Sequence, residues 1–394
     1  MKNVQTKSTL LALLLGLSAC AGEVGGSQDG EDPSVDTTED VETEEDVELT
    51  PYEEALQNRE IDYPSALRIA ALRLTGDLPS MQDQKDLQNA GDAKSTYEAL
   101  ISMYIADPRF AETQIEFWKN NFKMGGSPVL DSAGIFAAQL VVEGRSYLEL
   151  LTAASGTCPT YDAATSAFVP GECDNGVTTH AGLLTHPGMN AHFSSNMAFR
   201  RTRWVQETFA CTAFPAEVAA EPEQLSDTAI YTAPWEFTSI AGLESGGDID
   251  FLDYQSVVCA NCHATMNHIA PLFGYFDDLG LATNDISVPK PVDGNPMTTM
   301  ADWLPAGEQP AWRLGEPVAD LPQLGNAMAN DTRIAECAVA RAWNWAMGKG
   351  DIVDTLSTVP PEVFAAQYQE FIDTNYNFKT LTFSVFTSED FIRF

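Results

Sequence analysis

At residues 259–263 the chain reads Cys259-Ala260-Asn261-Cys262-His263. Two residues separate the cysteines and a histidine follows the second one directly, which is the C-x-x-C-H pattern of covalent haem attachment. Two thiols at this spacing can form thioether bonds with the haem vinyl groups, and the adjacent imidazole can bind the iron as its proximal ligand. The pattern therefore predicts one c-type haem, held by Cys259, Cys262 and His263.

Two other interpretations of this stretch are weaker. Cys259 and Cys262 could form a redox disulfide, or could bind zinc together with His263 and His268. A zinc site of this type needs a longer loop between its cysteine pair and its histidine pair. Because the chain contains a single C-x-x-C-H, a multi-haem chain is excluded.

The residues after the motif indicate how the proximal histidine is oriented. Pro271 follows the motif, and a second-shell carbonyl on a metal-binding imidazole fixes its tautomer and raises its basicity. We therefore expect His263 to bind iron through Nε2 and to donate its Nδ1–H to the Pro271 carbonyl.

The sixth iron ligand decides the chemistry, because methionine raises the potential, histidine lowers it and an open position favours peroxide or oxygen chemistry. The first candidates are Met300 and Met297, in a loop downstream of the motif. His186 and His192 are the next, and an open site is the third possibility. His268 follows His263 too closely to reach the other face of the ring.

A predicted helix over 195–211 carries Arg200, Arg203 and Glu207 on one face. The two arginines could bind haem propionates, since guanidinium groups pair with carboxylates in a bidentate manner. The favoured interpretation, however, is an ordinary solvated or salt-bridged helix face.

The N-terminus predicts export. Lys2 and Lys7 precede an apolar run over 10–17 that is too short to span a bilayer, and the run ends in Leu17-Ser18-Ala19-Cys20. This resembles a bacterial lipoprotein signal covering residues 1–19, with lipid attached to Cys20. Ala21 then implies sorting to the outer membrane, facing the periplasm or the cell surface. The alternative is an ordinary cleaved signal in which Cys20 is incidental.

The charge balance is strongly acidic, at −36 from 21 basic and 57 acidic residues. Nucleic acid is excluded as a partner, because phosphate binding needs a basic surface. Residues 20–51 are acidic and rich in Gly, Ser and Thr, which predicts a disordered tether rather than a folded segment. The lipid is the only membrane attachment that the sequence predicts. The acidic surface favours a basic redox protein as the partner.

Four cysteines remain after lipid and haem attachment, and an oxidising envelope favours disulfides between them. We expect Cys158 to pair with Cys173, closing a local loop, and Cys211 to pair with Cys337, joining two helices. One or both pairs could instead be buried thiols.

Apolar residues recur at helical spacing along most of the chain. The predicted fold is mainly α: a multi-helical body with an embedded cytochrome c-like haem-binding segment. In the first half, helices are expected from Tyr63 to Gly76, from Pro79 onward, over a further stretch that stops at Asp107, over the aromatic stretch 110–122 and over 133–151. In the second half they are expected from Asp331 to Gly348 and over 378–394. The expected parts are an N-terminal helical domain (52–154), a disulfide-stapled loop (155–178) and a haem-c helical domain (179–394), whose C-terminal module covers 318–394.

Several of these motifs together resemble the planctomycete-type cytochrome c family of multi-module proteins. The resemblance is carried by His180 to Cys211, by the motif block Val258 to Gly280, and by two C-terminal blocks, Arg333 to Gly348 and Asn375 to Phe394. It implies haem c and an envelope location. The chain departs from the family at Asn267-His268, where Asp-Pro is common.

The sequence thus predicts an envelope lipoprotein in which one haem transfers single electrons. A haem oxidase or peroxidase with an open iron site is the first alternative. A binding module in which the haem is a structural cross-link is the second.

Overall fold

The computed structural model describes residues 58–195, 198–214, 265–283, 309–313 and 316–394, together with the backbone of four short strands at 223–224, 232–233, 288–289 and 297–298. Residues Gln57–Phe394 form one compact unit, distinct from Met1–Leu56. The predicted signal, Cys20 and the acidic tether lie outside the described residues. No helix in the described part of the chain combines the length and the apolarity needed to cross a bilayer.

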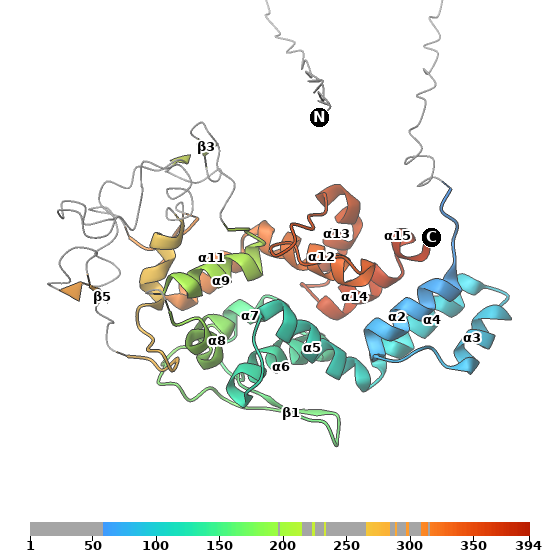
Figure 1. Cartoon of the computed structure of the whole chain (residues 1–394), viewed down its shortest axis with the longest axis horizontal. Helices are drawn as coiled ribbons and strands as arrows, with labels where there is room; N and C mark the ends of the chain where they lie inside the picture. Colours follow the sequence, from blue (N-terminus) through green and yellow to red (C-terminus); the bar gives the residue numbers. More distant parts are fainter. Residues whose placement is uncertain are drawn as a thin grey trace, which may run out of the picture. The chain divides into compact units, whose positions relative to one another are not determined.

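The described residues are mainly helical, as the sequence predicts (Figure 1). The first helices are α2 (Tyr63–Thr75), α3 (Met81–Gln88), α4 (Ala93–Ala106) and α5 (Arg109–Phe122). Side-chain caps set the starts of the first two: Asp62 accepts a hydrogen bond from the Ser65 N–H before α2, and Ser80 with Asp83 forms a capping box before α3. Gly76 ends α2 in the left-handed conformation, with φ of 76°.

The bounds predicted for the helix over 133–151 are wrong. The structure has α6 (Pro128–Glu143) and a separate short helix α7 (Glu149–Thr152). Gly144 takes φ of 67° directly after α6, and the Arg145 N–H donates to the Leu140 carbonyl at 2.8 Å. This is a glycine helix stop of the Schellman type, which the apolar periodicity on both sides conceals.

The loop predicted over 155–178 contains a small hairpin. Strand β1 (Thr160–Asp162) pairs antiparallel with β2 (Ala167–Val169). A disulfide between Cys158 and Cys173 closes the base of the hairpin, which confirms the predicted pairing.

The second half of the unit is also helical. Its elements are η1 (Gly182–Thr185), α8 (Pro187–His192), α9 (Phe199–Ala210), η2 (Ala270–Phe273), α11 (Leu321–Ala329), α12 (Thr332–Met347), η4 (Pro361–Phe364), α13 (Ala365–Asp373), α14 (Phe378–Phe386) and α15 (Glu389–Ile392). Two-residue strands pair antiparallel as β3 (Glu223–Gln224) with β4 (Thr232–Ala233), β5 (Val288–Pro289) with β6 (Met297–Thr298), and β7 (Ala311–Trp312) with β8 (Glu316–Pro317).

The final helix predicted over 378–394 is divided into α14 and α15. Ser388 causes the break, since its backbone is extended and its side chain caps the Phe391 N–H at the start of α15. The predicted helix of the C-terminal module is confirmed as α12, which begins after Asp331 and ends at Gly348. Cys337 on α12 is bonded to Cys211 at the end of α9, which confirms the second predicted disulfide.

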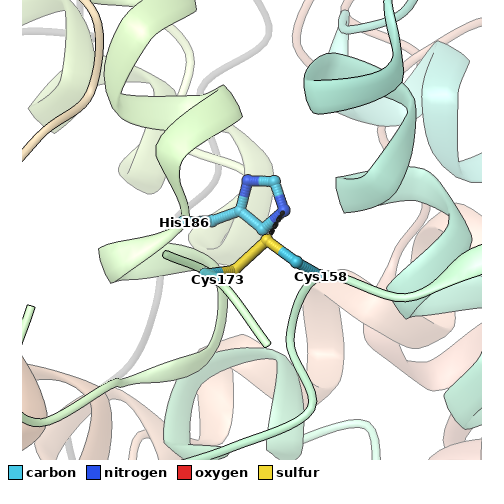
Figure 2. Close-up of side chains that lie close together, drawn as sticks. All are labelled: Cys158, Cys173 and His186. Carbon is cyan, nitrogen blue, oxygen red and sulfur yellow. Dashed lines mark hydrogen bonds between the residues drawn. A yellow bond between two sulfur atoms is a disulfide. The ribbon is translucent and has the colours of Figure 1, made fainter. Parts of the chain in front are cut away.

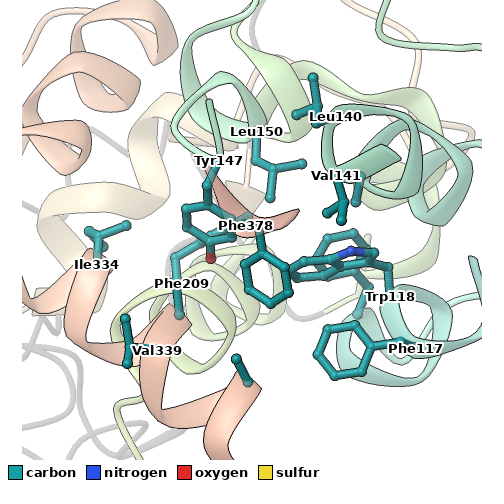
Figure 3. Close-up of a cluster of buried hydrophobic side chains, with 14 of the residues drawn as sticks. Phe117, Trp118, Leu140, Val141, Tyr147, Leu150, Phe209, Ile334, Val339 and Phe378 are labelled. Carbon is teal, nitrogen blue, oxygen red and sulfur yellow. The ribbon is translucent and has the colours of Figure 1, made fainter. Parts of the chain in front are cut away.

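One hydrophobic core joins the predicted N-terminal domain to the predicted haem-c domain. Figure 3 shows Phe117 and Trp118 of α5 beside Phe378 of α14, whose ring centroid lies 5.0 Å from that of Trp118. Phe209 of α9 and Val339 of α12 belong to the same cluster. The aromatic side chains of α5 are therefore core residues, as their density in the sequence predicts.

Backbone pairing also joins the two ends of this unit. Glu60 and Phe394 exchange two N–H to C=O hydrogen bonds of 3.0 and 2.9 Å, and the Asp62 N–H donates to the Ile392 carbonyl at 2.9 Å. In addition, the Tyr97 hydroxyl donates to the Phe386 carbonyl at 2.7 Å. The first and last helices of the unit are thus held together directly.

Candidate functional site

The haem motif itself, Cys259, Cys262 and His263, lies outside the described residues, as does Met300. Met297 falls in strand β6, of which only the backbone is described. The description resumes at Thr265, two residues after His263, with a helical turn over 265–269 that leads into η2.

This segment packs directly on α9, as Figure 1 shows for the gold helical segment beside the green helix. The Thr265 hydroxyl donates to Gln206 Oε1 at 3.1 Å. Ile269, Ala270 and Phe273 are fully buried. The residues that follow the motif are therefore fixed to the helical body and do not form a free loop.

Pro271 is buried within η2. Its carbonyl accepts the Gly274 N–H at 3.2 Å. A carbonyl oxygen has two lone pairs, so one acceptor position remains for a second donor. The expected hydrogen bond from His263 stays a prediction, because His263 is not described.

Arg201 holds the segment from the other side and was missed in the sequence. Its guanidinium donates to four backbone carbonyls, those of Asn190 (2.9 Å), Phe273 (2.9 Å), Phe276 (3.0 Å) and Asp277 (2.6 Å). Burial lowers the pKa of Arg201 to about 10, partly opposed by the nearby carboxylates of Asp277 and Asp278. The group thus stays charged at neutral pH. The helical spacing could have identified it, because Arg201 lies three residues before Trp204 and four before Val205, on the apolar face of α9.

The two arginines that the sequence singled out point to solvent. Arg200 donates to Ser195 Oγ at 3.0 Å and lies over the Phe193 ring. Arg203 pairs with Glu207, with 2.7 Å between Nε and Oε1. This is the salt-bridged face that the sequence allowed, and no anion-binding arrangement of Arg200 with Arg203 is present among the described residues.

The histidine-containing stretch 180–192 packs against the segment after the motif. Asn175 donates through Nδ2 to the carbonyls of Thr185 (2.9 Å) and Gly280 (3.2 Å). Gly280 has φ of 76°, and a Cβ there would lie 2.2 Å from the Pro187 carbonyl oxygen. Only glycine permits this approach. Two stretches that the sequence linked only by their histidines are therefore neighbours in the fold.

His186 is fully buried, and both of its ring nitrogens are engaged (Figure 2). The Gly188 N–H donates to Nδ1 at 3.0 Å, while Nε2 lies 3.2 Å from Ser132 Oγ and 3.5 Å from Cys158 Sγ. Burial, with a smaller contribution from His180, lowers the pKa of His186 to about 3, so the ring is neutral. In this arrangement His186 has no nitrogen available for iron, and we do not assign it as a ligand.

His192 differs from His186 in its burial and in its hydrogen bonding. It is exposed at the end of α8, where its ring meets that of Phe193 edge to face, with centroids 4.6 Å apart. Its imidazole makes no hydrogen bond among the described residues. His268, in the helical turn after the motif, is 1% exposed. Of the two histidines considered for the sixth position, His186 and His192, only His192 has an accessible imidazole.

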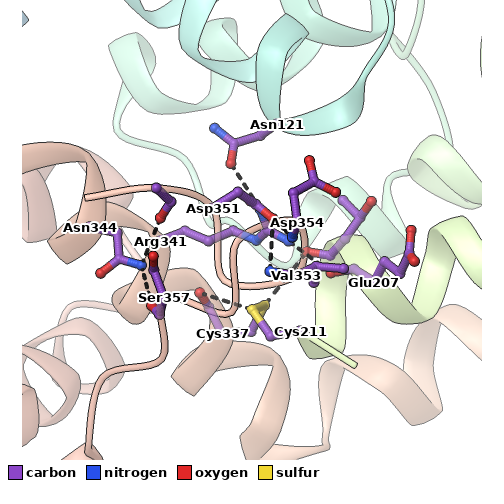
Figure 4. A network of polar contacts seen from close by, with 12 residues as sticks. Asn121, Glu207, Cys211, Cys337, Arg341, Asn344, Asp351, Val353, Asp354 and Ser357 are labelled. Carbon is purple, nitrogen blue, oxygen red and sulfur yellow. Dashed lines mark hydrogen bonds and ion pairs between the residues drawn. A yellow bond between two sulfur atoms is a disulfide. The ribbon is translucent and has the colours of Figure 1, made fainter. Parts of the chain in front are cut away.

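A groove of about 570 Å³ lies elsewhere, between α2, α5, α12 and the loop after α12. Its floor includes the buried Arg341, which donates to Asn121 Oδ1 (3.0 Å), to the Glu207 carbonyl (2.8 Å) and to Asp351 (Figure 4). Burial raises the pKa of Asp351, but the charge of Arg341 and the backbone N–H groups of Asp354 and Val353 outweigh it, so the pKa is lowered overall.

Other charges in the groove are paired as well. Lys123 bonds Asp354 at 2.6 Å, and Arg109 bonds Asp77 and Asp107 at 2.7 Å each. These ion pairs make the groove a polar seam between the helices, and we assign no reaction to it.

We compared the chain with protein-family models, with characterised proteins and with solved structures, and none of them matches it. No relative therefore supplies a function or a set of site residues. The arrangement of the chain's own side chains carries the functional argument.

Proposed function

We propose that this protein binds one c-type haem covalently through Cys259, Cys262 and His263 and transfers single electrons in the bacterial cell envelope. The observation that carries the proposal is the C-x-x-C-H motif, in a chain whose N-terminal sequence predicts export. The bound haem would supply a one-electron Fe(III)/Fe(II) couple.

The packing after the motif supports this function. Thr265 is fixed to Gln206 on one side, and Arg201 holds the carbonyls of Phe273, Phe276 and Asp277 on the other. A ligand set works best on rigid, packed elements, because the supporting side chains fix its geometry. In this proposal the anchored segment, which starts two residues after His263, gives the haem site a rigid support.

A buried polar atom beside Thr265 fits a hydrogen-bond acceptor. The Gln206 side chain is 4% exposed, and its Nε2 has no hydrogen-bond partner among the described residues. Leaving a buried N–H unpaired costs about 1–3 kcal/mol, so such a group is rarely retained without a use. Haem carries two propionate carboxylates, which are acceptors only. We propose that Gln206 donates to one of them.

The sixth position is proposed to be Met300, with Met297 next. His192 is the histidine candidate that remains, since it is exposed and its ring nitrogens are free of hydrogen bonds within the described residues. An open position would instead favour the oxidase or peroxidase alternative.

The experiment that tests the proposal is denaturation of the purified exported protein, acetone extraction and the pyridine haemochrome spectrum. We expect a c-type band that survives extraction. Cys259→Ser and Cys262→Ser should each leave one thioether and shift the band to longer wavelength, and the double variant should lose it. A wild-type protein without extraction-resistant haem would refute the proposal. The oxidised spectrum with added cyanide then separates electron transfer from an open site, because rapid cyanide binding requires an exchangeable sixth position.

A further inference from the structure

The two disulfides of the unit lie in opposite chemical surroundings. Cys158 Sγ lies 3.5 Å from His186 Nε2, and Cys173 Sγ lies 3.2 Å from Thr157 Oγ1. In the other disulfide, Cys211 Sγ is 3.8 Å from the Cys337 carbonyl and Cys337 Sγ is 3.6 Å from the Thr208 carbonyl. Among the described residues, only the first pair faces side chains that can donate a hydrogen bond to sulfur.

The proton on His186 can be placed from its partners. The Gly188 N–H can only donate, so Nδ1 accepts and carries no proton. The neutral ring therefore carries its proton on Nε2. Ser132 Oγ donates to the Val129 carbonyl at 2.9 Å, which leaves the Ser132 oxygen as an acceptor for Nε2–H. The same N–H is directed toward Cys158 as well, so a stronger acceptor at that sulfur could take it over.

This placement argues against a metal at the same cluster. The ligand atoms of Cys158, Cys173 and His186 lie within 4.8 Å of one another. Metal binding through Nε2 would move the ring proton to Nδ1, where it would face the Gly188 N–H, and two donors would then oppose each other. His186 is thus arranged as a hydrogen-bond donor and not as a ligand.

We propose that Cys158–Cys173 is a site of thiol–disulfide exchange that accepts a dithiol reductant. Cys158 is partly exposed and Cys173 is buried. The thiolate of the reductant therefore attacks Cys158 Sγ, a mixed disulfide forms, and Cys173 leaves as a thiolate that accepts a hydrogen bond from the Thr157 hydroxyl.

The second thiol of the reductant, as its thiolate, then attacks the reductant's first sulfur, which is bonded to Cys158 in the mixed disulfide. The reductant leaves as a disulfide, and Cys158 leaves as a thiolate that accepts the Nε2–H of His186. Two electrons pass from the dithiol to the protein. The two protons that the dithiol loses balance those taken up when both cysteines become thiols.

Reduction would have a local structural consequence. The disulfide closes the base of the β1–β2 hairpin, where the Cys158 N–H also donates to the Gly171 carbonyl at 3.1 Å. Without the disulfide, the two sides of the base are joined by hydrogen bonds such as this one and the bond from the Gly156 N–H to Glu172 Oε2 at 2.8 Å. The hairpin becomes the part of the unit that responds to the thiol state of the envelope.

The test is timed reduction of the folded, exported protein with dithiothreitol, followed by an acid quench, alkylation and peptide mass spectrometry. We expect Cys158 and Cys173 to be labelled at least about tenfold faster than Cys211 and Cys337, a ratio within the range that one hydrogen bond to a charged group provides. Equal rates, or faster labelling of Cys211 and Cys337, would overturn the proposal.

Three variants test the contacts themselves, each after circular dichroism has verified folding. His186→Asn keeps a side-chain cap for the Gly188 N–H but removes the donor to Cys158, so the equilibrium between disulfide and dithiol should shift about tenfold toward the disulfide. Ser132→Ala removes the competing acceptor, so it should shift the equilibrium toward the dithiol. Thr157→Val should slow reduction, because the leaving thiolate loses its donor. If His186→Asn does not fold, the opposite effects of the other two variants still decide the matter, and no change in either would refute the proposal.

Discussion

Arg201 and Asp277 are joined by a hydrogen bond of 2.6 Å between the guanidinium Nη2 and the Asp277 backbone carbonyl. The bond connects α9 to the segment after the haem motif across an interval of the chain that the structure largely does not describe. It belongs to a set of four carbonyl contacts made by one 2% exposed side chain. Arg201 therefore makes the largest set of hydrogen bonds described between α9 and this segment.

Replacing Arg201 should show this dependence. Lysine cannot reach four carbonyls with one ammonium group, so Arg201→Lys should lower the free energy of unfolding by about 2–4 kcal/mol. Chemical denaturation followed by circular dichroism measures the change. Arg200→Lys is the matched control on the adjacent, exposed position, and it should change stability by less than about 0.5 kcal/mol. Equal effects of the two variants would contradict the assignment.

Gln206 should affect the haem more than the fold. Gln206→Leu keeps most of the side-chain volume but removes the proposed donor to a propionate, so the negative charge near the iron is less screened and the oxidised form gains stability. We expect the midpoint potential to fall by roughly tens of millivolts. Potentiometric titration measures it. Gln139→Leu, whose amide bonds Glu143 on α6, is the control and should leave the potential unchanged.

The sixth ligand can be identified by spectroscopy. Met300→Ala should abolish the near-infrared charge-transfer absorption of methionine-bound ferric haem and lower the potential, because methionine ligation raises it. His192→Ala should leave both unchanged. The opposite result, with the spectrum altered only by His192→Ala, would assign the position to His192 and reverse our order of preference.

Asp351 should make stability depend on acid. Its folded-state pKa lies below the ordinary value of 3.8, so its contribution is fully present above that value and is lost as the pH falls through the folded-state pKa. Asp351→Asn should therefore destabilise the protein at pH 7, and the difference from the wild type should shrink as the pH falls below about 4. Urea denaturation at several pH values measures this difference. Asp354→Asn, at an exposed ion pair, is the control and should cost less than about 1 kcal/mol at any pH.

Membrane attachment depends on Cys20 in our proposal. Cys20→Ala should move the protein from the membrane fraction to the soluble fraction of the envelope, because the acyl chains on this residue are the only anchor proposed. Fractionation and intact mass of the N-terminal peptide measure the change. Continued membrane attachment of the variant would refute the lipoprotein assignment and favour an ordinary cleaved signal.

The parts of the fold that could be predicted have local causes. The ends of α2 and α12 follow from Gly76 and Gly348, and the aromatic stripe of α5 is buried as its spacing indicates. The number of cysteines left after the predicted lipid and haem attachment, together with the predicted oxidising compartment, favoured disulfides, and the pairing expected among the three possible is the one observed.

The errors arise where a single residue overrides periodicity. Gly144 divides the helix predicted over 133–151, and Ser388 divides the last one, although apolar residues recur on both sides. Arg201 was missed because its partners are backbone carbonyls, which leave no trace in the side-chain pattern. His186 was a candidate ligand only because its type suits iron; its contacts with Gly188 and Ser132 depend on packing between segments far apart in the chain.

The pairing of Glu60 with Phe394 bears on the order in which the protein is made and folds. Helix α2 lies near the beginning of the described unit, yet the backbone groups just before it, together with Tyr97 of α4, are satisfied by residues 386–394. The N-terminal helices cannot reach their final packing until these residues have been synthesised. The fold is therefore completed only after residue 394 has been added, which is compatible with the proposed export of the chain as an extended polypeptide.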